Sequence, residues 1–376
     1  MLKIVCYNAD TSRNNLFLKG LPVIRARLFR TIRPICVAAA VLAFTLPAAT
    51  ETSAQTKSSS RPTASKPAAK KKTAYSASAA RKRRAALQRA RAEAAAKALR
   101  EAQEPHFKFD ENGALVPDVR AEAAIIYNPE NGKVLWETNS QDQRSIASIT
   151  KVMTAVVFLE ENPNLSHRVV IQSSDVIRAS TTYLKRNDSV TKEDLLHLLL
   201  IASDNAAARA LARTSNHGAQ GFVERMNAKA LELGLTNTKY SEPSGLLSTN
   251  VSSAYDMARL ITYVSGDSRI AGVMQKQEYK VTAGRRTVTI RSTNHLVRES
   301  EYQVQAGKTG FISKAGYCLA TLLRLPQTGQ QVAVVVLGAK SNAGRFWETK
   351  HLFNWLSAKA SELFGGTPVE AAAPAK

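Results

Sequence analysis

The sequence has few of the residues that build disulfides and metal sites. It contains three cysteines, Cys6, Cys36 and Cys318, and six histidines in 376 residues. Removal of an N-terminal targeting segment would leave only Cys318, which excludes an internal disulfide. No cysteine–histidine cluster has metal-ligand spacing, and no histidine completes a convincing Ser-His-Asp arrangement. Cys318 lies in the apolar stretch GYCLATLL, which predicts a buried strand residue.

Acidic residues are scarce, above all near the N-terminus. The chain has 52 Lys/Arg against 30 Asp/Glu, a formal net charge of +22. Residues 1–104 hold 21 Lys/Arg and five Asp/Glu, so they carry +16 of this charge and the rest of the chain only +6. A high positive charge is typical of nucleic-acid-binding proteins. Because this charge belongs mostly to the N-terminal region, we expect no specific nucleic-acid partner.

An apolar run near the N-terminus, PICVAAAVLAFTLPAA, is too short for a comfortable membrane span. Basic residues precede it and small residues follow it, which is the pattern of a secretory signal peptide. We place the signal at residues 1–54; an uncleaved inner-membrane anchor is the alternative. Both interpretations predict that the protein is exported to the periplasm. The flanking residues are Arg25, Arg27, Arg30 and Arg33 before the run, and Ala48, Ala49, Ser53 and Ala54 at its end.

The next region lacks large apolar residues. Residues 55–77 are rich in Ser, Ala, Lys and Pro, which predicts a disordered basic linker. Residues 78–104 are rich in Ala and Arg and have high helix propensity. Without a large apolar stripe, such a helix would not pack on a core. It is either a contact for an anionic surface, such as lipid or cell-wall polymer, or a solvated spacer.

The folded domain is expected at residues 105–365, with a flexible tail at 366–376. Two apolar runs around Asn-Pro-Glu-Asn-Gly predict a β-hairpin at residues 121–138. Helical apolar spacing then predicts several helices, one of them capped by Thr191, and alternating β-branched residues predict strands. The expected helices are residues 148–161, 191–202, 205–214, 221–234, 253–264 and 345–364, and the later strands lie within 278–291, 302–312, 316–326 and 330–339.

The order of these elements indicates the fold class. For the hairpin and the later strands to share one sheet, the helical block must be inserted between them. We therefore expect an α+β fold in which an antiparallel sheet is flanked by helices and carries an inserted helical lobe. The alternation typical of a doubly wound parallel sheet is absent.

A serine stands one helical turn before a lysine where the first helix begins. In SIASITKVMT, Ser148 is either a helix N-cap followed by a solvated Lys151, or a nucleophile followed by its base. Lys151 lies on the same helix face and can reach the Ser148 hydroxyl. A lysine accepts a proton near pH 7 only if its pKa falls well below the ordinary value, which burial and a second cation would produce. Lys308 is the second cation that we expect.

Two further stretches favour the nucleophile. ASDNAA places Ser-Asp-Asn, residues 203–205, at the junction between two expected helices, and AGKTGF places Lys-Thr-Gly, residues 308–310, at the start of an expected strand. Each is ordinary alone. The order SxxK, SDN, KTG, in these structural settings, is the signature of penicillin-binding proteins and serine β-lactamases.

With these motifs, the sequence resembles the low-molecular-mass penicillin-binding proteins, a family of serine D-alanyl-D-alanine carboxypeptidases and endopeptidases acting on peptidoglycan. Supporting stretches are EPSGLLSTNVSSAYDMARL, GFISKAGYCLA and VVVLGAKSNAGRFWETKHLFNWL, and the likeness covers roughly residues 115–358. The resemblance implies the β-lactamase/DD-peptidase-like fold, peptidoglycan peptides as substrates and covalent inhibition by β-lactams.

The resemblance also implies roles for the first two motifs. Ser148 would form an acyl-enzyme that water hydrolyses, with Lys151 as its base. Ser203 would relay a proton between the lysine and the leaving amine. Asn205 would hydrogen-bond the substrate backbone and help to position Lys151. No metal or organic cofactor is required.

The third motif would hold the substrate. By the same resemblance, Thr309 and Lys308 bind its carboxylate end, and the backbone N–H groups of Ser148 and Phe311 form the oxyanion hole. Gly310 leaves room for a substrate strand against the sheet edge.

Two other classes of protein remain open. A serine β-lactamase shares the three motifs, but class A enzymes deacylate with a glutamate in an E-x-x-L-N stretch, and neither ELGLT (Glu232 to Thr236) nor EPSGL (Glu242 to Leu246) has that pattern or spacing. EPSGL instead resembles a peptidase segment in which aspartate is more familiar than Glu242. The other class is an exported polymer-binding protein, in which the basic N-terminal region would bind the polymer.

Within the peptidases, we favour a D,D-endopeptidase over a carboxypeptidase. Membrane-attached carboxypeptidases of this family carry a second, β-rich C-terminal domain and a terminal amphipathic helix, whereas only the loose stretch GGTPVEAAAPAK follows the last expected helix here. SDNAAARALAR also resembles the endopeptidase subgroup, which cuts D-alanyl–meso-diaminopimelyl cross-links.

Overall fold

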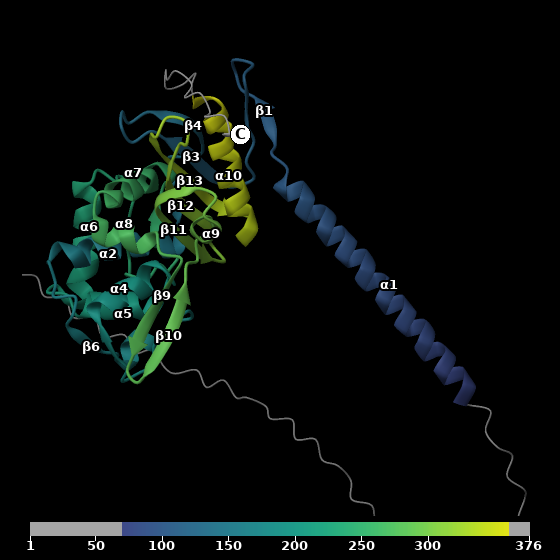
Figure 1. Ribbon diagram of the computed structural model, residues 1–376, viewed down its shortest axis with the longest axis horizontal. Helices are drawn as coiled ribbons and strands as arrows, with labels where there is room; N and C mark the ends of the chain where they lie inside the picture. Colours follow the sequence, from purple (N-terminus) through teal and green to yellow (C-terminus); the bar gives the residue numbers. More distant parts are fainter. Residues whose placement is uncertain (1–69, 361–376) are drawn as a thin grey trace, which may run out of the picture. The chain divides into compact units, whose positions relative to one another are not determined.

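The computed structural model describes the backbone of residues 70–360. The predicted signal, the tail and most of the predicted linker lie outside these residues. Helix α1 spans Lys70–Gln103, so it begins within the segment predicted as linker (Figure 1). Its described side chains are exposed to solvent, as the lack of an apolar stripe predicts. No helix in the described part of the chain is both long and apolar enough to cross a bilayer.

A five-stranded antiparallel sheet forms the centre of the domain, in the order β11-β12-β13-β3-β4 (Figure 1). Strands β3 (Ala123–Tyr127) and β4 (Val134–Thr138) form the predicted hairpin. Strand β13 (Gln331–Ala339) pairs with β3, so the early hairpin and the late strands share one sheet, as predicted. The other two strands are β11 (Gln303–Ile312) and β12 (Gly316–Arg324).

Both faces of the sheet are buried, which explains why its central strands are apolar throughout rather than alternating. On one face, Ile126 and Val334 pack with Leu352 and Phe353 of helix α10 (Asn342–Ala358). On the other, Ile125 and its neighbours join the core formed with helices α2 (Thr150–Glu160) and α7 (Ala254–Ser265).

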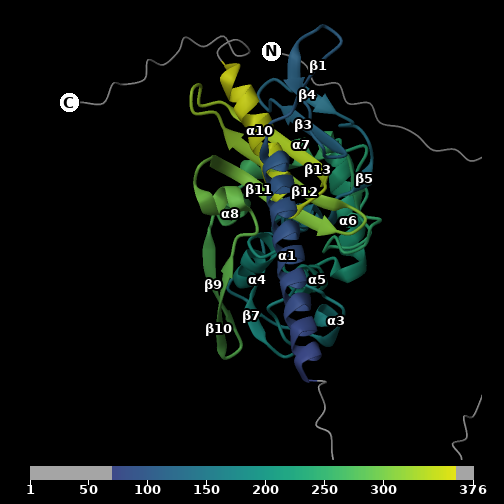
Figure 2. The ribbon, with the colours of Figure 1, turned by 90° about the vertical axis from the view of Figure 1, so that its right-hand side faces the viewer.

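The inserted helical lobe consists of α2 together with α4 (Lys192–Leu200), α5 (Asn205–Arg213) and α6 (Gly218–Glu232). The Thr191 side chain accepts a hydrogen bond from the Asp194 N–H, so it is the predicted N-cap of α4. A ribbon of two strands, β9 (Glu278–Ala283) and β10 (Arg286–Arg291), lies along α4 (Figure 2).

Several short elements have no clear periodicity in the sequence and were not predicted. They are strands β1 (Phe107–Phe109), β2 (Leu115–Pro117), β5 (Arg144–Ser145), β6 (Arg168–Val170), β7 (Ser189–Thr191) and β8 (Val251–Ser252), and helices α3 (Ser173–Val176), α8 (Ser268–Met274) and α9 (His295–Glu299).

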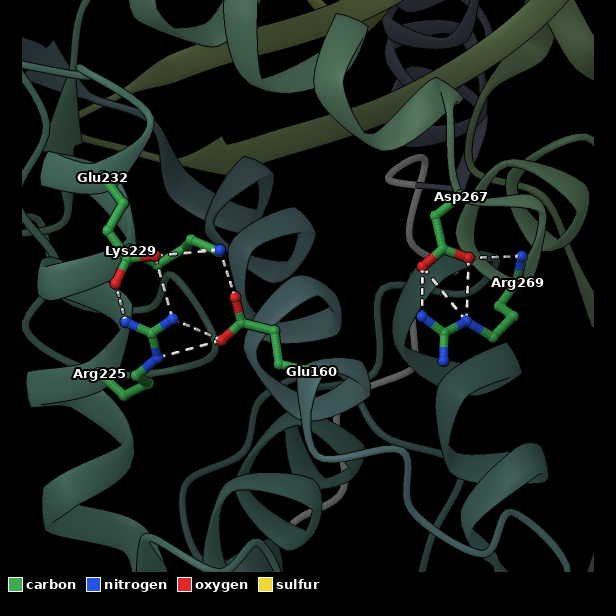
Figure 3. Close-up of polar contacts among 6 residues, drawn as sticks. All are labelled: Glu160, Arg225, Lys229, Glu232, Asp267 and Arg269. Atoms are coloured by element: carbon green, nitrogen blue, oxygen red, sulfur yellow. Dashed lines mark hydrogen bonds and ion pairs between the residues drawn. The ribbon is translucent and has the colours of Figure 1, made fainter. Parts of the chain in front are cut away.

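A cluster of ion pairs joins the C-terminal end of α2 to α6. Figure 3 shows Glu160 between Arg225 and Lys229, and both cations also contact Glu232. The Arg225 Nη2 atom lies 2.9 Å from Glu160 Oε2. A separate pair joins Asp267 and Arg269. The Glu160, Arg225 and Lys229 side chains are partly buried, and the cluster links α6 to the end of α2 that lies away from Ser148.

Candidate active site

Ser148 lies in a short 3-10 helix, Ala147–Ile149, that leads directly into α2. The N-cap position of α2 is Ile149, and no side chain caps this end. The Thr150 hydroxyl donates to the Ala147 carbonyl at 2.8 Å. The interpretation of Ser148 as a helix cap is therefore wrong.

The Lys151 side chain is fully buried beside Ser148. Its Nζ lies 2.9 Å from Ser148 Oγ and 2.6 Å from Asn205 Oδ1, and it also contacts the Ser244 carbonyl oxygen. Burial lowers the pKa of Lys151 to about 7, although the charge of Glu242 acts to raise it. A solvated Lys151, the second part of the capping interpretation, is thereby excluded.

The partners of Lys151 fix the direction of its lone pair. The Asn205 Nδ2 group donates to the Ala179 carbonyl at 2.6 Å, so the Oδ1 atom faces the lysine. An amide oxygen and the Ser244 carbonyl only accept hydrogen bonds, and they take the two N–H groups of a neutral amine. The remaining lone pair then faces the Ser148 hydroxyl, which is the arrangement that general-base catalysis requires.

A second buried lysine, Lys308, contacts the SDN motif. Its Nζ donates to Ser203 Oγ at 2.8 Å and to the Thr309 carbonyl at 2.9 Å. Burial, and next the charge of Lys151, lower the pKa of Lys308 well below its ordinary value. The Lys308 amine of β11 thus contacts the junction between α4 and α5, where Ser203 lies.

The charge of Arg209 on α5 also lowers the pKa of Lys151. Lys151 and Lys308 repel each other as well, and this repulsion appears as a lowering of the pKa of Lys308. Burial is the larger cause for both lysines.

The KTG triplet lies in the second half of β11, not at the start of the strand as predicted. The strand begins earlier because Gln303 and Val304 already pair with β12 before a register shift at Ala306. Within the triplet, the Thr309 hydroxyl lies 2.7 Å from the Thr293 hydroxyl and donates to it.

Two glycines pack against the turn that carries Ser148. A Cβ atom on Gly310 would lie 2.6 Å from the Ile146 carbonyl oxygen and 3.2 Å from Ser148 N. On another side, a Cβ on Gly245 would lie 2.0 Å from the Ala147 oxygen. Gly310 therefore brings the β11 backbone next to the Ser148 amide, where the predicted oxyanion hole requires it.

These residues surround a cleft of about 330 Å³. Six of the eight predicted site residues line it, and Lys151 and Lys308 lie buried behind its wall. The lining residues are Ser148, Ser180, Thr181, Ala202, Ser203, Asn205, Leu246, Thr293, Thr309, Gly310, Phe311, Ile312 and Arg345.

Sequence reasoning missed two charged residues of the site. Arg345 of α10 donates from Nη1 to the carbonyls of Gly310 at 2.9 Å and Cys318 at 3.2 Å, and its burial lowers its pKa to about 10. Glu242 accepts the N–H groups of Ser244 and Leu246, each at 2.7 Å. Both occur in stretches that resemble the peptidases, but only their contacts reveal that they support β11 and the Ser244 carbonyl.

Comparisons with known proteins agree on one family. A profile of the peptidase S11 family, described as D-alanyl-D-alanine carboxypeptidase, matches residues 110–341. The chain is 34% identical over 232 residues to a D-alanyl-D-alanine endopeptidase of Haemophilus influenzae, covering 61% of this chain and 80% of the relative. It is 33% identical over 244 residues to the D-alanyl-D-alanine endopeptidase of Escherichia coli K12, covering 64% and 78%.

Solved structures show the same likeness. The Streptomyces K15 DD-transpeptidase superposes with a TM-score of 0.59 at 27% identity, over 64% of this chain and 98% of that one. Penicillin-binding protein 5 from Haemophilus influenzae gives 0.60 at 27% identity, over 65% and 73%. The predicted fold class is confirmed.

The close packing around Ser148 predicts that Gly245→Ala is strongly destabilising. Gly245 has a φ of +80°, and the added Cβ would overlap the Ala147 backbone. We expect a loss of more than ~3 kcal/mol in the free energy of unfolding, measured by chemical denaturation.

The matched control is Gly272→Ala, an exposed position in α8 where an added Cβ meets open space. This change should be neutral or stabilising by up to ~1 kcal/mol, because alanine favours a helix more than glycine. Equal stabilities of the two variants would contradict the packing argument.

Proposed function

Because the chain belongs to the peptidase S11 family and is a serine-type D-alanyl-D-alanine peptidase, we propose that it hydrolyses D,D cross-links of peptidoglycan through an acyl-enzyme on Ser148. The observation that carries the proposal is the contact between Ser148 and a buried Lys151 whose pKa is about 7. The similarity to relatives named endopeptidases favours cross-links as the substrate. Carboxypeptidases also occur among its relatives, so removal of a terminal D-alanine is the alternative.

In the first step, Ser148 Oγ attacks the carbonyl carbon of the D-alanyl residue while Lys151 Nζ accepts the hydroxyl proton. The negative charge that develops on the carbonyl oxygen is stabilised by the N–H groups of Ser148 and Phe311. Ser203, held by the Lys308 amine at 2.8 Å, relays this proton from Lys151 to the leaving amine, so that the Lys151 amine is neutral again. The peptide bond breaks and leaves an ester on Ser148.

In the second step, water attacks the ester carbonyl and Lys151 accepts a proton from the water. Lys151 returns this proton to Ser148 Oγ as the ester bond breaks, which regenerates the serine and the neutral amine. Asn205 positions Lys151 and hydrogen-bonds the substrate backbone. Thr309 and Lys308 bind the carboxylate end of the substrate, and Gly310 lets the substrate strand lie against β11. The mechanism requires no metal or organic cofactor. β-Lactams would acylate the same serine.

In this proposal, the N-terminal regions export the protein and attach it to an anionic surface. Residues 1–54 direct export to the periplasm, the part of the predicted linker before α1 connects them to the basic helix, and residues 105–365 form the catalytic domain. The exposed basic side chains of α1 contact an anionic surface. No specific nucleic-acid partner is part of the proposal.

The cleavage specificity can be measured by mass spectrometry of muropeptides. A D,D-cross-linked dimer and a pentapeptide monomer are offered together to the purified protein, with Ser148→Ala as the control. We expect conversion of the dimer to monomers, and no reaction with the variant. Loss of only the terminal alanine from the pentapeptide would make the protein a carboxypeptidase, and fast turnover of penicillin instead of a long-lived adduct would indicate a β-lactamase.

The acylation rate should depend on the protonation of Lys151. Only the neutral amine accepts a proton, and the pKa of Lys151 is about 7. The rate of acylation by a labelled penicillin should therefore rise with pH, with a midpoint at about pH 7.

The variant Glu242→Gln removes a negative charge that raises the pKa of Lys151, so the midpoint should move to lower pH. The control variant Glu224→Gln, at an exposed site on α6, should leave the midpoint unchanged. A midpoint that stays fixed or moves upward in Glu242→Gln would show that another group controls the rate.

The surface contact of α1 can be tested by co-sedimentation with vesicles containing phosphatidylglycerol. Replacing Arg81, Lys82, Arg83 and Arg84 with glutamine should weaken binding by up to about a thousandfold, at about 1 kcal/mol per residue, and added salt should weaken the wild-type interaction. Vesicles of phosphatidylcholine alone are the control. Equal sedimentation of both proteins would indicate that α1 is a solvated spacer.

A further inference from the structure

A second cavity, of about 420 Å³, lies beyond Phe311 and outside the catalytic cleft. Phe311 lines both spaces and is about half exposed. Its ring stacks on Tyr317, with centroids 4.2 Å apart and an interplanar angle of 23°. The two rings therefore form a shared wall, and a ligand that follows β11 out of the cleft would pass over it into the second cavity.

This second cavity carries a surplus of positive charge. Arg144, Lys314 and Lys340 line it, whereas Glu122 is its one acid. Lys340 forms an ion pair with Glu122, which lowers the pKa of that carboxyl. One acid thus faces three cations.

The other two cations form no ion pair among the described residues, although the charge of Arg144 also lowers the pKa of Glu122. The Lys314 side chain is exposed, and neither it nor the Arg144 guanidinium forms a hydrogen bond or ion pair there. The Arg144 Nε–H is buried without a hydrogen-bond partner. A buried donor that lacks a partner in the protein is costly. The planar guanidinium fork favours a carboxylate.

The position of the cavity relative to Ser148 restricts which carboxylate it can receive. The residues proposed to bind the carboxylate end of the substrate, Lys308 and Thr309, precede Phe311 along β11. Lys314 follows it, in the turn after the strand. A substrate strand along β11 would therefore place its two ends on opposite sides of Phe311. The part on the side of Lys314 is the acyl donor, which remains attached to Ser148.

We propose that this cavity binds a free carboxylate of the acyl-donor stem through Arg144 and Lys314. The inference rests on the proposed function, since it assigns a second subsite for the same peptide substrate. It adds a charge requirement on the donor side of the scissile bond, where the catalytic motifs have no cation free to meet it.

The test compares two cross-linked muropeptide dimers, one with the free donor carboxylate and one with that carboxylate amidated. Full-length wild type, Arg144→Gln and Lys314→Gln are assayed with both, and KM and kcat are determined separately. We expect each variant to raise KM for the free-carboxylate dimer about tenfold, the effect of one lost charged hydrogen bond. For the amidated dimer, wild type should show the same raised KM, and the difference between wild type and variants should largely disappear.

Lys280→Gln, at an exposed lysine of β9 far along the chain from this cavity, is the matched control and should behave as wild type with both dimers. Because Lys314 is an exposed turn residue, its variant gives a result even if Arg144→Gln folds poorly. If amidation does not change the KM of the wild type, the proposed subsite is wrong, whereas the endopeptidase function still stands. Failure of wild type to cleave either dimer would overturn both.

Discussion

The burial of the Lys151 amine is the constraint on which the site depends. An ammonium group taken out of water without a carboxylate against it loses much of its hydration energy, so the neutral form becomes accessible near pH 7. That burial needs three separate parts of the chain: the start of α2, the head of α5 and the Ser244 segment. Each offers a neutral oxygen rather than a carboxylate. The base exists only when these parts are assembled.

Burial also lowers the pKa of Lys308, although the charges around it differ from those around Lys151. Lys308 faces a hydroxyl and a backbone carbonyl, and its nearest charged influences are cationic. The negative charges of Glu242 and Asp204 act on Lys151 and raise its pKa, against the effect of burial. The pKa of Lys308 falls well below the ordinary value of a lysine. Two identical side chains thus have their proton affinities set by their surroundings alone.

The sheet, the hairpin and the chemistry-bearing motifs could be predicted because their signals are local. Apolar runs around a turn identify β3 and β4, and Ser148, Lys151 and Asn205 belong to short motifs of fixed spacing. The contribution of Ser244 could not be predicted, since it is made by a carbonyl group that every residue possesses. Arg345 likewise reaches the site only because α10 packs across β11 and β12. The extent of β11 was misjudged because pairing with β12, rather than local composition, sets where it begins.

The sheet order has a consequence for how the enzyme comes into existence. Strand β3 pairs residues 123–127 with residues 333–337 of β13, so the central ladder joins nearly opposite ends of the catalytic domain. Contacts so distant in sequence close slowly, because the entropy of a long loop is lost before they form. The wall of the cleft formed by β11 belongs to the same sheet. A chain still emerging from the ribosome therefore holds the nucleophile and its lysine but lacks the surface that completes them, and the hydrolase is inert until its last strand is in place.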